Sequence, residues 1–180
     1  MLNSRFRFFI LIVFLLFFIV LLLIFSNKNT SVLYGNNRDL IKTAIVTRSP
    51  IIDREDIEII DIVDIDESRI VGFSSNGYLG VLLFEKDKNL NYVMNYYELD
   101  SHSESSFVIN YDNNSKIAIV VLSNGNKATN VEVTIMNHKY NKDIPLYKPS
   151  MFIFKDDLLK KKNHLSITIN FFDSLGNQLI

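Results

Sequence analysis

Residues 8–25 form an uninterrupted run of eighteen apolar side chains, and this run constrains the chain more than any other feature of its sequence. A helix of that length would be about 27 Å long, close to the hydrocarbon thickness of a bilayer. A cleaved signal peptide is the alternative, but its apolar core is normally about 7–15 residues long and small residues follow it. Residues 26–30 contain no Ala-x-Ala pattern. We therefore expect an uncleaved, single-pass signal-anchor helix.

The charges on either side of this run predict its orientation. Arg5 and Arg7 precede it, no acid occurs before Asp39, and Lys28 is the first charge after it. Positive charge is retained in the cytoplasm, so we expect the N-terminus inside the cell and the remainder outside. The predicted location is the cell membrane, and the predicted segments are a cytoplasmic N-terminus (1–7), a transmembrane anchor (8–25), a spacer (26–36) and an extracytoplasmic domain (37–180).

The composition of residues 26–180 excludes one large class of partner. These residues hold all 20 acids and 17 of the 19 basic side chains, which gives a net charge of −3. A nucleic-acid-binding domain normally carries a basic patch and a basic overall charge. We therefore predict no nucleic-acid partner. The chain has no cysteine, and about 155 residues can bury enough apolar surface to fold without disulfides.

Most of the predicted outer domain carries strand signals. Residues 131–135 and 166–171 alternate apolar and polar side chains, which indicates strands with one buried and one wet face. Residues 79–84 and 117–122 are continuous apolar runs, as expected of central strands. We predict a mainly β domain with an α+β margin, built as an antiparallel β-sheet or β-sandwich.

One or two short helices complete the predicted domain. Asn37 can cap a helix over residues 38–46, which Ser49 and Pro50 would end, because a residue before proline avoids the helical region. A second short helix is predicted near residues 156–162, where acids come first and bases last.

Four polar segments carry turn signals. Asn-Gly is a strong signal for a tight hairpin, and it occurs twice after Ser. We predict hairpin turns at Ser75-Asn76-Gly77, Ser123-Asn124-Gly125, Asp112-Asn113-Asn114-Ser115 and Ser174-Leu175-Gly176-Asn177.

The layout resembles that of uncharacterised small membrane-anchored, β-rich proteins of low-GC Gram-positive bacteria. The segments nearest to that pattern are Ile57–Ile65, Arg69-Ile70-Val71-Gly72-Phe73 and Tyr78-Leu79-Gly80-Val81. The resemblance covers most of the chain but includes no diagnostic motif. It implies the architecture described above and assigns no function to any residue.

The acidic stretch 53–67 is the first candidate for chemistry. Asp64 and Asp66 with Ser68 have the oxygen-rich spacing that calcium requires, and they are the candidate metal ligands. The remainder of the calcium-loop pattern fails, because Arg69 occupies the position of the glycine and Ser75 that of the final glutamate. We therefore predict no metal site and interpret the stretch as a strand with an acidic outer face and turn, at a protected edge.

The polar segment 100–106 contains the residue types of a hydrolytic triad, including His102, but the chain has no Gly-x-Ser-x-Gly elbow. His102, His138 and His164 lack metal-ligand spacing, and no phosphate-binding loop is present. We therefore predict no catalytic residue, no cofactor and no enzymatic activity. The alternative is a metal- or carboxylate-dependent envelope hydrolase built around Asp61, Asp64 and His102.

Aromatic residues gather in one β region, and Tyr96 and Tyr97 are adjacent in it. Adjacent residues of a strand point to opposite faces, so only one of the two rings can belong to the core, and the other is exposed, covered by the partner or covered by another element of the domain. We expect alanine at one of the two to reduce stability and alanine at the other to reduce partner binding. Lys160–Lys162 could meet anionic headgroups or wall polymers. We thus predict a membrane-anchored binding or accessory protein of the cell envelope, whose partner is an envelope protein or a wall polymer.

The apolar run and its flanking arginines predict a definite topology. The full-length protein should sediment with membranes, and protease added to spheroplasts should digest residues 26–180. Lysed cells treated with the same protease are the control for accessibility. A soluble product that begins near Ser26 would show that the apolar run is cleaved and contradict the anchor.

Overall fold

A computed structural model of the chain describes residues 32–112, 116–155 and 166–179. Within these ranges the fold is mainly β, with one helix and antiparallel sheets, which confirms the predicted class. The described elements are α2 (Arg38–Arg48), β1 (Glu58–Ile65), β2 (Ser68–Ser75), β3 (Tyr78–Lys86), β4 (Tyr92–Asp100), β5 (Glu104–Tyr111), β6 (Lys116–Ser123), β7 (Asn130–Ile135), β8 (His138–Asp143), β9 (Ser150–Phe154), β10 (Ile167–Phe172) and β11 (Gln178–Leu179).

Two predicted elements lie outside the described residues, namely the anchor at 8–25 and the helix near 156–162. In the part of the chain that the structure describes, no helix has the length and hydropathy needed to span a bilayer.

Helix α2 forms where the sequence predicts it. The side chain of Asn37 caps its first turn, accepting a hydrogen bond of 2.9 Å from the backbone N–H of Leu40. Ile41, Ala44 and Ile45 are buried on one face. The helix ends at Ser49, immediately before Pro50, so its predicted start and stop signals are both confirmed.

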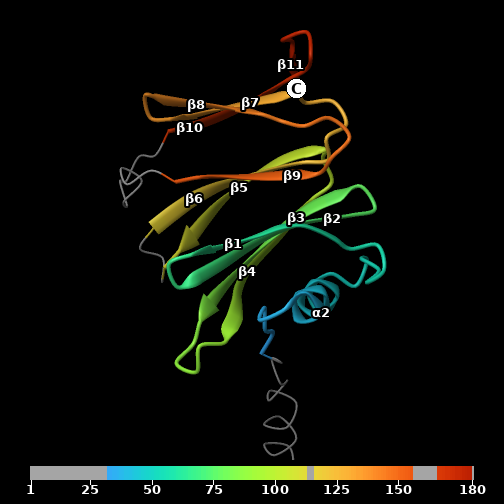
Figure 1. The fold of residues 1–180 in the computed structure, drawn as a ribbon, viewed down its shortest axis with the longest axis vertical. Helices are drawn as coiled ribbons and strands as arrows, with labels where there is room; N and C mark the ends of the chain where they lie inside the picture. Colours follow the sequence, from blue (N-terminus) through green and yellow to red (C-terminus); the bar gives the residue numbers. More distant parts are fainter. Residues whose placement is uncertain (1–31, 113–115, 156–165, 180) are drawn as a thin grey trace, which may run out of the picture. The chain divides into compact units, whose positions relative to one another are not determined.

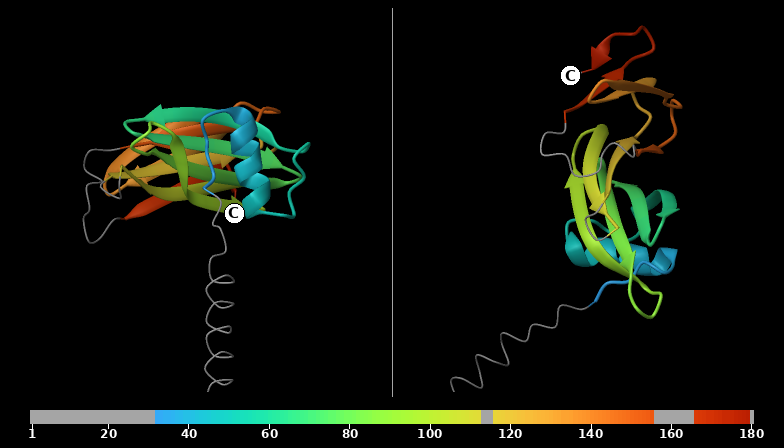
Figure 2. Two further views of the ribbon diagram at one scale, coloured as in Figure 1. Left: turned by 90° about the horizontal axis from the view of Figure 1, so that it is seen from below. Right: turned by 90° about the vertical axis from the view of Figure 1, so that its left-hand side faces the viewer.

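The strands form three antiparallel sheets (Figure 1). Sheet A has the order β1-β2-β3-β4, sheet B has the order β5-β6-β9, and sheet C has the order β11-β10-β7-β8. Sheet B lies between sheets A and C, and α2 packs on the face of sheet A that points away from sheet B (Figures 1 and 2). The described fold therefore has three stacked sheets, whereas a β-sandwich has two.

This stack has three hydrophobic cores. The first lies between α2 and sheet A, the second between sheets A and B, and the third between sheets B and C. Strand β6 contributes to the second core through Leu122 and to the third through Ile119, and both side chains are fully buried. Strand β3 similarly divides its side chains between the first and second cores. The two continuous apolar runs of the sequence are therefore strands that are covered on both faces.

Three of the four predicted hairpins are confirmed. Ser75-Asn76-Gly77 joins β2 to β3, with positive φ angles at Asn76 and Gly77, as a type I′ turn requires. Strands β5 and β6 pair antiparallel across the segment 112–115, and β10 pairs with β11 across the segment 174–177.

The predicted hairpin at Ser123-Asn124-Gly125 is wrong. The strand that follows it, β7, belongs to sheet C, so this segment carries the chain from one sheet to another. Gly125 has a positive φ of 72° and packs so closely that a Cβ atom would lie 2.7 Å from the backbone of Lys148. Its carbonyl accepts a 2.8 Å hydrogen bond from the N–H of Tyr147. The glycine is needed because the loop before β9 packs directly against it. The same Ser-Asn-Gly motif therefore forms a hairpin at residues 75–77 and a crossing between two sheets at residues 123–125.

The covering of β6 on both faces predicts the effect of two substitutions. Ile119→Ala and Leu122→Ala should each lower the free energy of unfolding by about 2–5 kcal/mol, because each leaves a cavity in a different core. Chemical denaturation of the full-length chain in non-ionic detergent measures both losses. Val108→Ala is the control, because Val108 is 45% exposed and its truncation should cost less than about 0.5 kcal/mol. A loss at Leu122 alone would contradict the packing of sheet C on β6.

Candidate functional site

The outer edge of β4 is the candidate site. Strand β4 is an edge strand of sheet A. In the described part of the chain, only the first residues of β4 are covered along its outer edge. The lead-in segment, Leu33–Asn36, covers them: Gly35 N–H donates to the Tyr92 carbonyl at 2.8 Å, and Met94 N–H donates to the Leu33 carbonyl at 2.8 Å. Beyond Met94, no described strand pairs with this edge. Residues 95–100 thus present an open strand edge.

A β-bulge marks the point where the covered part of this edge ends. The register with β3 passes from Phe84–Met94 to Leu83–Tyr96, so Asn95 is the extra residue. The Asn95 side chain is exposed, and its amide donates a 2.7 Å hydrogen bond to the carboxylate of Glu85. Bulges bend a strand and re-aim the side chains that follow, and here those are the two adjacent tyrosines.

The two tyrosines point to opposite faces of sheet A, as predicted. Tyr96 packs against the core between sheets A and B, and its hydroxyl hydrogen-bonds the carboxylate of Glu98. Tyr97 packs against the core beneath α2 and stacks on Phe73, with ring centroids 6.2 Å apart. Burial raises the pKa of the Tyr97 hydroxyl. Both rings are half-buried, because sheet A is covered on both faces. Of the three alternatives for the second ring, the structure shows cover by another element of the domain.

Two hollows flank this open edge. One lies beside the end of α2 and has a volume of about 320 Å³, and the other lies between β4 and β5 and has a volume of about 130 Å³. The first is lined by Arg48, Met94, Asn95, Tyr96 and Tyr97, and the second by Leu83, Asn95, Tyr96, Val108 and Asn110. Tyr96 and Asn95 border both hollows. The sequence offered no signal for these hollows, because they depend on which elements meet at the edge.

Arg69 fixes the lead-in segment against sheet A. Its guanidinium group donates two hydrogen bonds to Asp64, of 2.6 and 2.8 Å, and a third of 2.9 Å to the carbonyl of Gly35. It also lies 4.0 Å from the centroid of the Tyr92 ring, a cation–π contact. The guanidinium group holds the pKa of Asp64 below its ordinary value. One arginine therefore joins β1, β2, β4 and the segment that leads into the domain.

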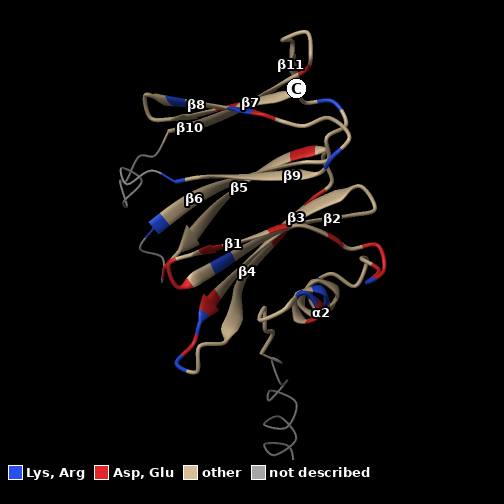
Figure 3. Ribbon diagram, viewed as in Figure 1, with Lys and Arg blue, Asp and Glu red and all other residues tan. Residues whose placement is uncertain are grey.

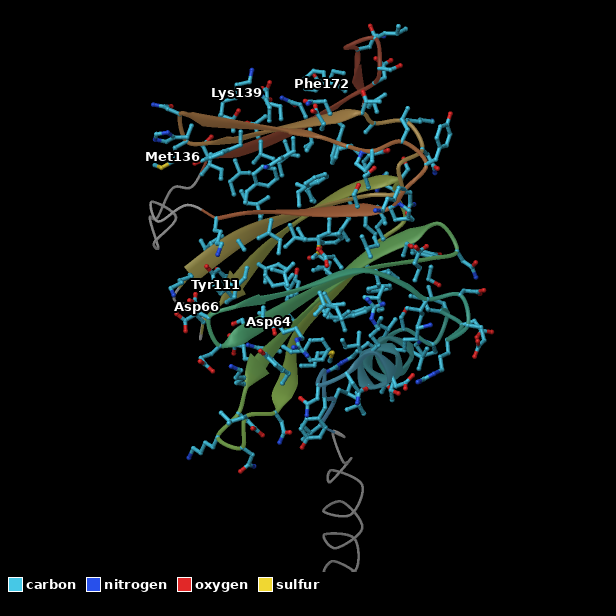
Figure 4. The ribbon with its side chains drawn as sticks, in the orientation of Figure 1. Asp64, Asp66, Tyr111, Met136, Lys139 and Phe172 are labelled. Carbon is cyan, nitrogen blue, oxygen red and sulfur yellow. The ribbon has the colours of Figure 1, made fainter. Side chains whose placement is uncertain are left out.

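The two candidate metal ligands are both engaged by cations (Figure 4). Asp64 pairs with Arg69, and Asp66 pairs with Lys116 at 2.9 Å. Among the described residues, no three His, Cys, Asp or Glu side chains converge as metal ligands would. The acidic stretch forms the edge strand β1 and its turn, as the sequence interpretation proposed. The carboxylates of Asp64 and Asp66 form ion pairs within the fold.

The residues of the alternative hydrolase site are not brought together. Asp64 on β1 is in register with Arg69 on β2, and Arg69 is in register with Phe84 on β3. Asp100 on β4 is in register with Leu79, near the other end of β3. The five residue steps from Leu79 to Phe84 separate these two positions of the sheet by roughly 17 Å.

His102 lies just beyond the Asp100 end, and its Nδ1 is 2.6 Å from the Asp100 carboxylate. Partial burial, the largest single influence, would raise the pKa of Asp100, but the interactions with His102 and Ser105 together outweigh it and hold the pKa below its ordinary value. Asp61 is exposed in the middle of β1, His138 is exposed on β8, and His164 lies outside the described residues.

Comparisons with known proteins return no similar chain: no protein-family model, curated protein or solved structure matches. The functional proposal therefore rests on the sequence and on the geometry of the described residues.

The ion pair of Asp64 with Arg69 predicts a specific acid dependence of stability. Because the folded pKa of Asp64 is lowered, its contribution is present above the unfolded value of about 3.9 and is lost as the pH falls through the lower, folded value. The contribution should be about 0.5–1 kcal/mol, since the Asp64 side chain is 47% exposed and solvent screens the pair. Thermal midpoints of the full-length chain between pH 7 and pH 2 measure it.

Asp64→Asn should lower the midpoint at pH 7 and flatten its fall below pH 4. In an Arg69→Gln background, the same substitution should change the acid limb little, because the partner is already absent. An equally steep acid limb in Asp64→Asn and in the original chain would contradict this assignment.

Proposed function

We propose that the chain is a membrane-anchored, extracytoplasmic binding or accessory protein of the cell envelope, without catalytic activity. The eighteen-residue apolar run and the flanking Arg5 and Arg7 support the anchor and its orientation. The layout shared with small membrane-anchored proteins of low-GC Gram-positive bacteria agrees with this location. The open edge of β4 supports the binding role, and it is the observation on which the proposal depends.

The proposed mode of binding is strand addition. An extended segment of an envelope protein would lie along β4 beyond Met94 and continue sheet A through main-chain hydrogen bonds. Such binding requires an edge with free backbone groups and without the charged residues that normally protect it. Residues 95–99 contain no Lys, Arg or Pro, and Glu98 is the single charge among them. This edge is therefore available to a partner strand.

The hollows beside β4 would give this interaction its specificity. In an added strand, successive side chains point to opposite faces of the sheet. One set would face the hollow beside α2, and the other would face the hollow between β4 and β5. Tyr96 borders both, and a half-buried aromatic ring is a common energetic anchor at interfaces. Tyr97 instead stacks on Phe73 and packs against the core.

The connection between the predicted anchor and this edge is short in sequence. Only residues 26–32 separate the predicted anchor from Leu33, which already bonds to β4. Seven extended residues reach at most about 25 Å. A partner that offers an extended segment near the membrane surface, such as another membrane protein of the envelope, therefore suits this edge.

The different environments of the two tyrosines predict different mutant phenotypes. Tyr96→Ala should reduce partner binding at least about fivefold, because the ring borders both hollows, and its partial packing against the core adds a smaller loss of stability than Tyr97→Ala causes. Tyr97→Ala should instead lower the free energy of unfolding by about 2 kcal/mol or more, because it removes a ring packed beneath α2. Binding is measured in cells as the yield of photo-crosslinking from a photo-reactive amino acid at Asn95, and mass spectrometry identifies the crosslinked segment.

The same photo-reactive amino acid at Asn141, on the edge strand β8, is the positional control and should give no such adduct. If the yield at Asn95 is the same in Tyr96→Ala as in the original chain, or if Asn141 gives the same adduct, the β4 edge is not the binding site.

A further inference from the structure

A second cleft, with different chemistry, opens between sheets B and C. It lies where the edge strand β8 faces the end of the edge strand β9, and its volume is about 440 Å³. This volume falls within the range of small-molecule binding sites. The cleft is lined by Lys139, Tyr140, Asn141, Lys142, Ile153, Phe154 and Lys155.

The floor of this cleft is aromatic and apolar. The rings of Tyr140 and Phe154 lie 6.1 Å apart between centroids and are tilted by 58°. Phe154 is 6% exposed and belongs to the core between sheets B and C, against which Tyr140 packs. The floor is therefore rigid and can accept the carbon skeleton of a ligand.

The rim of the cleft carries positive charge that no described acid neutralises. Lys142 and Lys155 are exposed, and neither forms an ion pair with a residue that the structure describes. Figure 3 shows basic positions, in blue, on β8 and at the end of β9. Lys139 differs, because its ammonium group pairs with Glu132 at 2.5 Å on the face of sheet C that points away from sheet B (Figure 4). The carboxylate of Asp143 accepts a 3.1 Å hydrogen bond from Asn130. Among the residues that the structure describes, no acid lines the cleft.

We infer that this cleft binds a polyanion with repeating phosphodiester groups linked by short carbon units. Its rim cations are lysines, which bind phosphate as point charges and lack the planar fork with which arginine binds carboxylates and phosphates bidentately. Two lysines on the rim of one open cleft fit successive charges of a polymer, and the aromatic floor fits the carbon units between them.

The edge chemistry of β8 argues against a peptide as the occupant. Strand β8 has the sequence His138-Lys139-Tyr140-Asn141-Lys142-Asp143, and charged side chains on an edge strand, lysine above all, oppose the addition of another strand. The open part of β4 has no lysine. The two edges are thus suited to different ligands, and the cleft does not depend on the function proposed for β4.

The test uses the full-length chain in nanodiscs of zwitterionic phosphatidylcholine and a fluorescent, synthetic oligomer of glycerol phosphate. Fluorescence anisotropy should detect binding that weakens with salt. The double variant Lys142→Gln/Lys155→Gln should bind about tenfold or more weakly at low salt, since each lysine contributes appreciably near a polyanion. Its slope of log affinity against log salt should fall by about 1.4, as expected for two lost phosphate contacts on a single strand.

Three controls make the result specific. Lys88→Gln/Lys127→Gln makes the same change in net charge at exposed sites away from the cleft and should bind as the original chain does. Lys142→Arg/Lys155→Arg should retain most of the binding. Vesicles of phosphatidylglycerol offer phosphodiesters in a lipid headgroup, and poly-glutamate of equal charge offers carboxylates; both should compete poorly with the oligomer.

Equal binding by the two glutamine double variants would overturn the inference, as would competition by poly-glutamate at the same concentration as the unlabelled oligomer. Better competition by the vesicles would assign the cleft to lipid headgroups and would also overturn it. Circular dichroism of each variant verifies that the fold is retained. Photo-crosslinking at Asn95 is unaffected by these outcomes, so failure here is distinguishable from failure of the proposed β4 site.

Discussion

The burial of β3 and β6 on both faces is the constraint on which the remaining structure depends. A strand whose side chains are all apolar cannot leave either face in water, so each needs a layer above and below it. Sheet A therefore lies between α2 and sheet B, and sheet B lies between sheets A and C. With the central sheet covered by its neighbours, the surfaces left for recognition are the strand edges and the clefts between layers.

The edges of the stack differ in what covers or protects them. The edge at β1 is protected by acidic side chains and a short turn, and the first part of β4 is covered by the lead-in segment that Arg69 holds in place. Beyond the bulge at Asn95, this cover ends and backbone groups are open to solvent. Arg69 thus has a consequence beyond its own ion pair, because it fixes which part of β4 is covered and which part is open.

The two candidate surfaces differ in chemistry. Near Tyr96, an edge without lysine lies between two hollows, which suits an extended polypeptide. Near Lys142 and Lys155, ammonium groups without an ion pair to any described residue border an aromatic floor, which suits a polyanion. A protein of the cell envelope with both surfaces would join a polypeptide partner to a charged polymer. This joining is what we mean by an accessory role.

The sequence by itself determined the local elements, because each depends on neighbours in the chain. The Asn37 cap, the turn at Asn76-Gly77 and the alternation in β7 could all be predicted from short segments, and the continuous apolar runs of β3 and β6 indicated central strands. Only the tertiary structure decided that the segment after Ser123 crosses between sheets, that Tyr96 and Tyr97 are both packed, and that Asp64 lies far from His102. These outcomes depend on which layers meet, and residues that form one core or one cleft lie far apart in the sequence, where no local pattern records their contact.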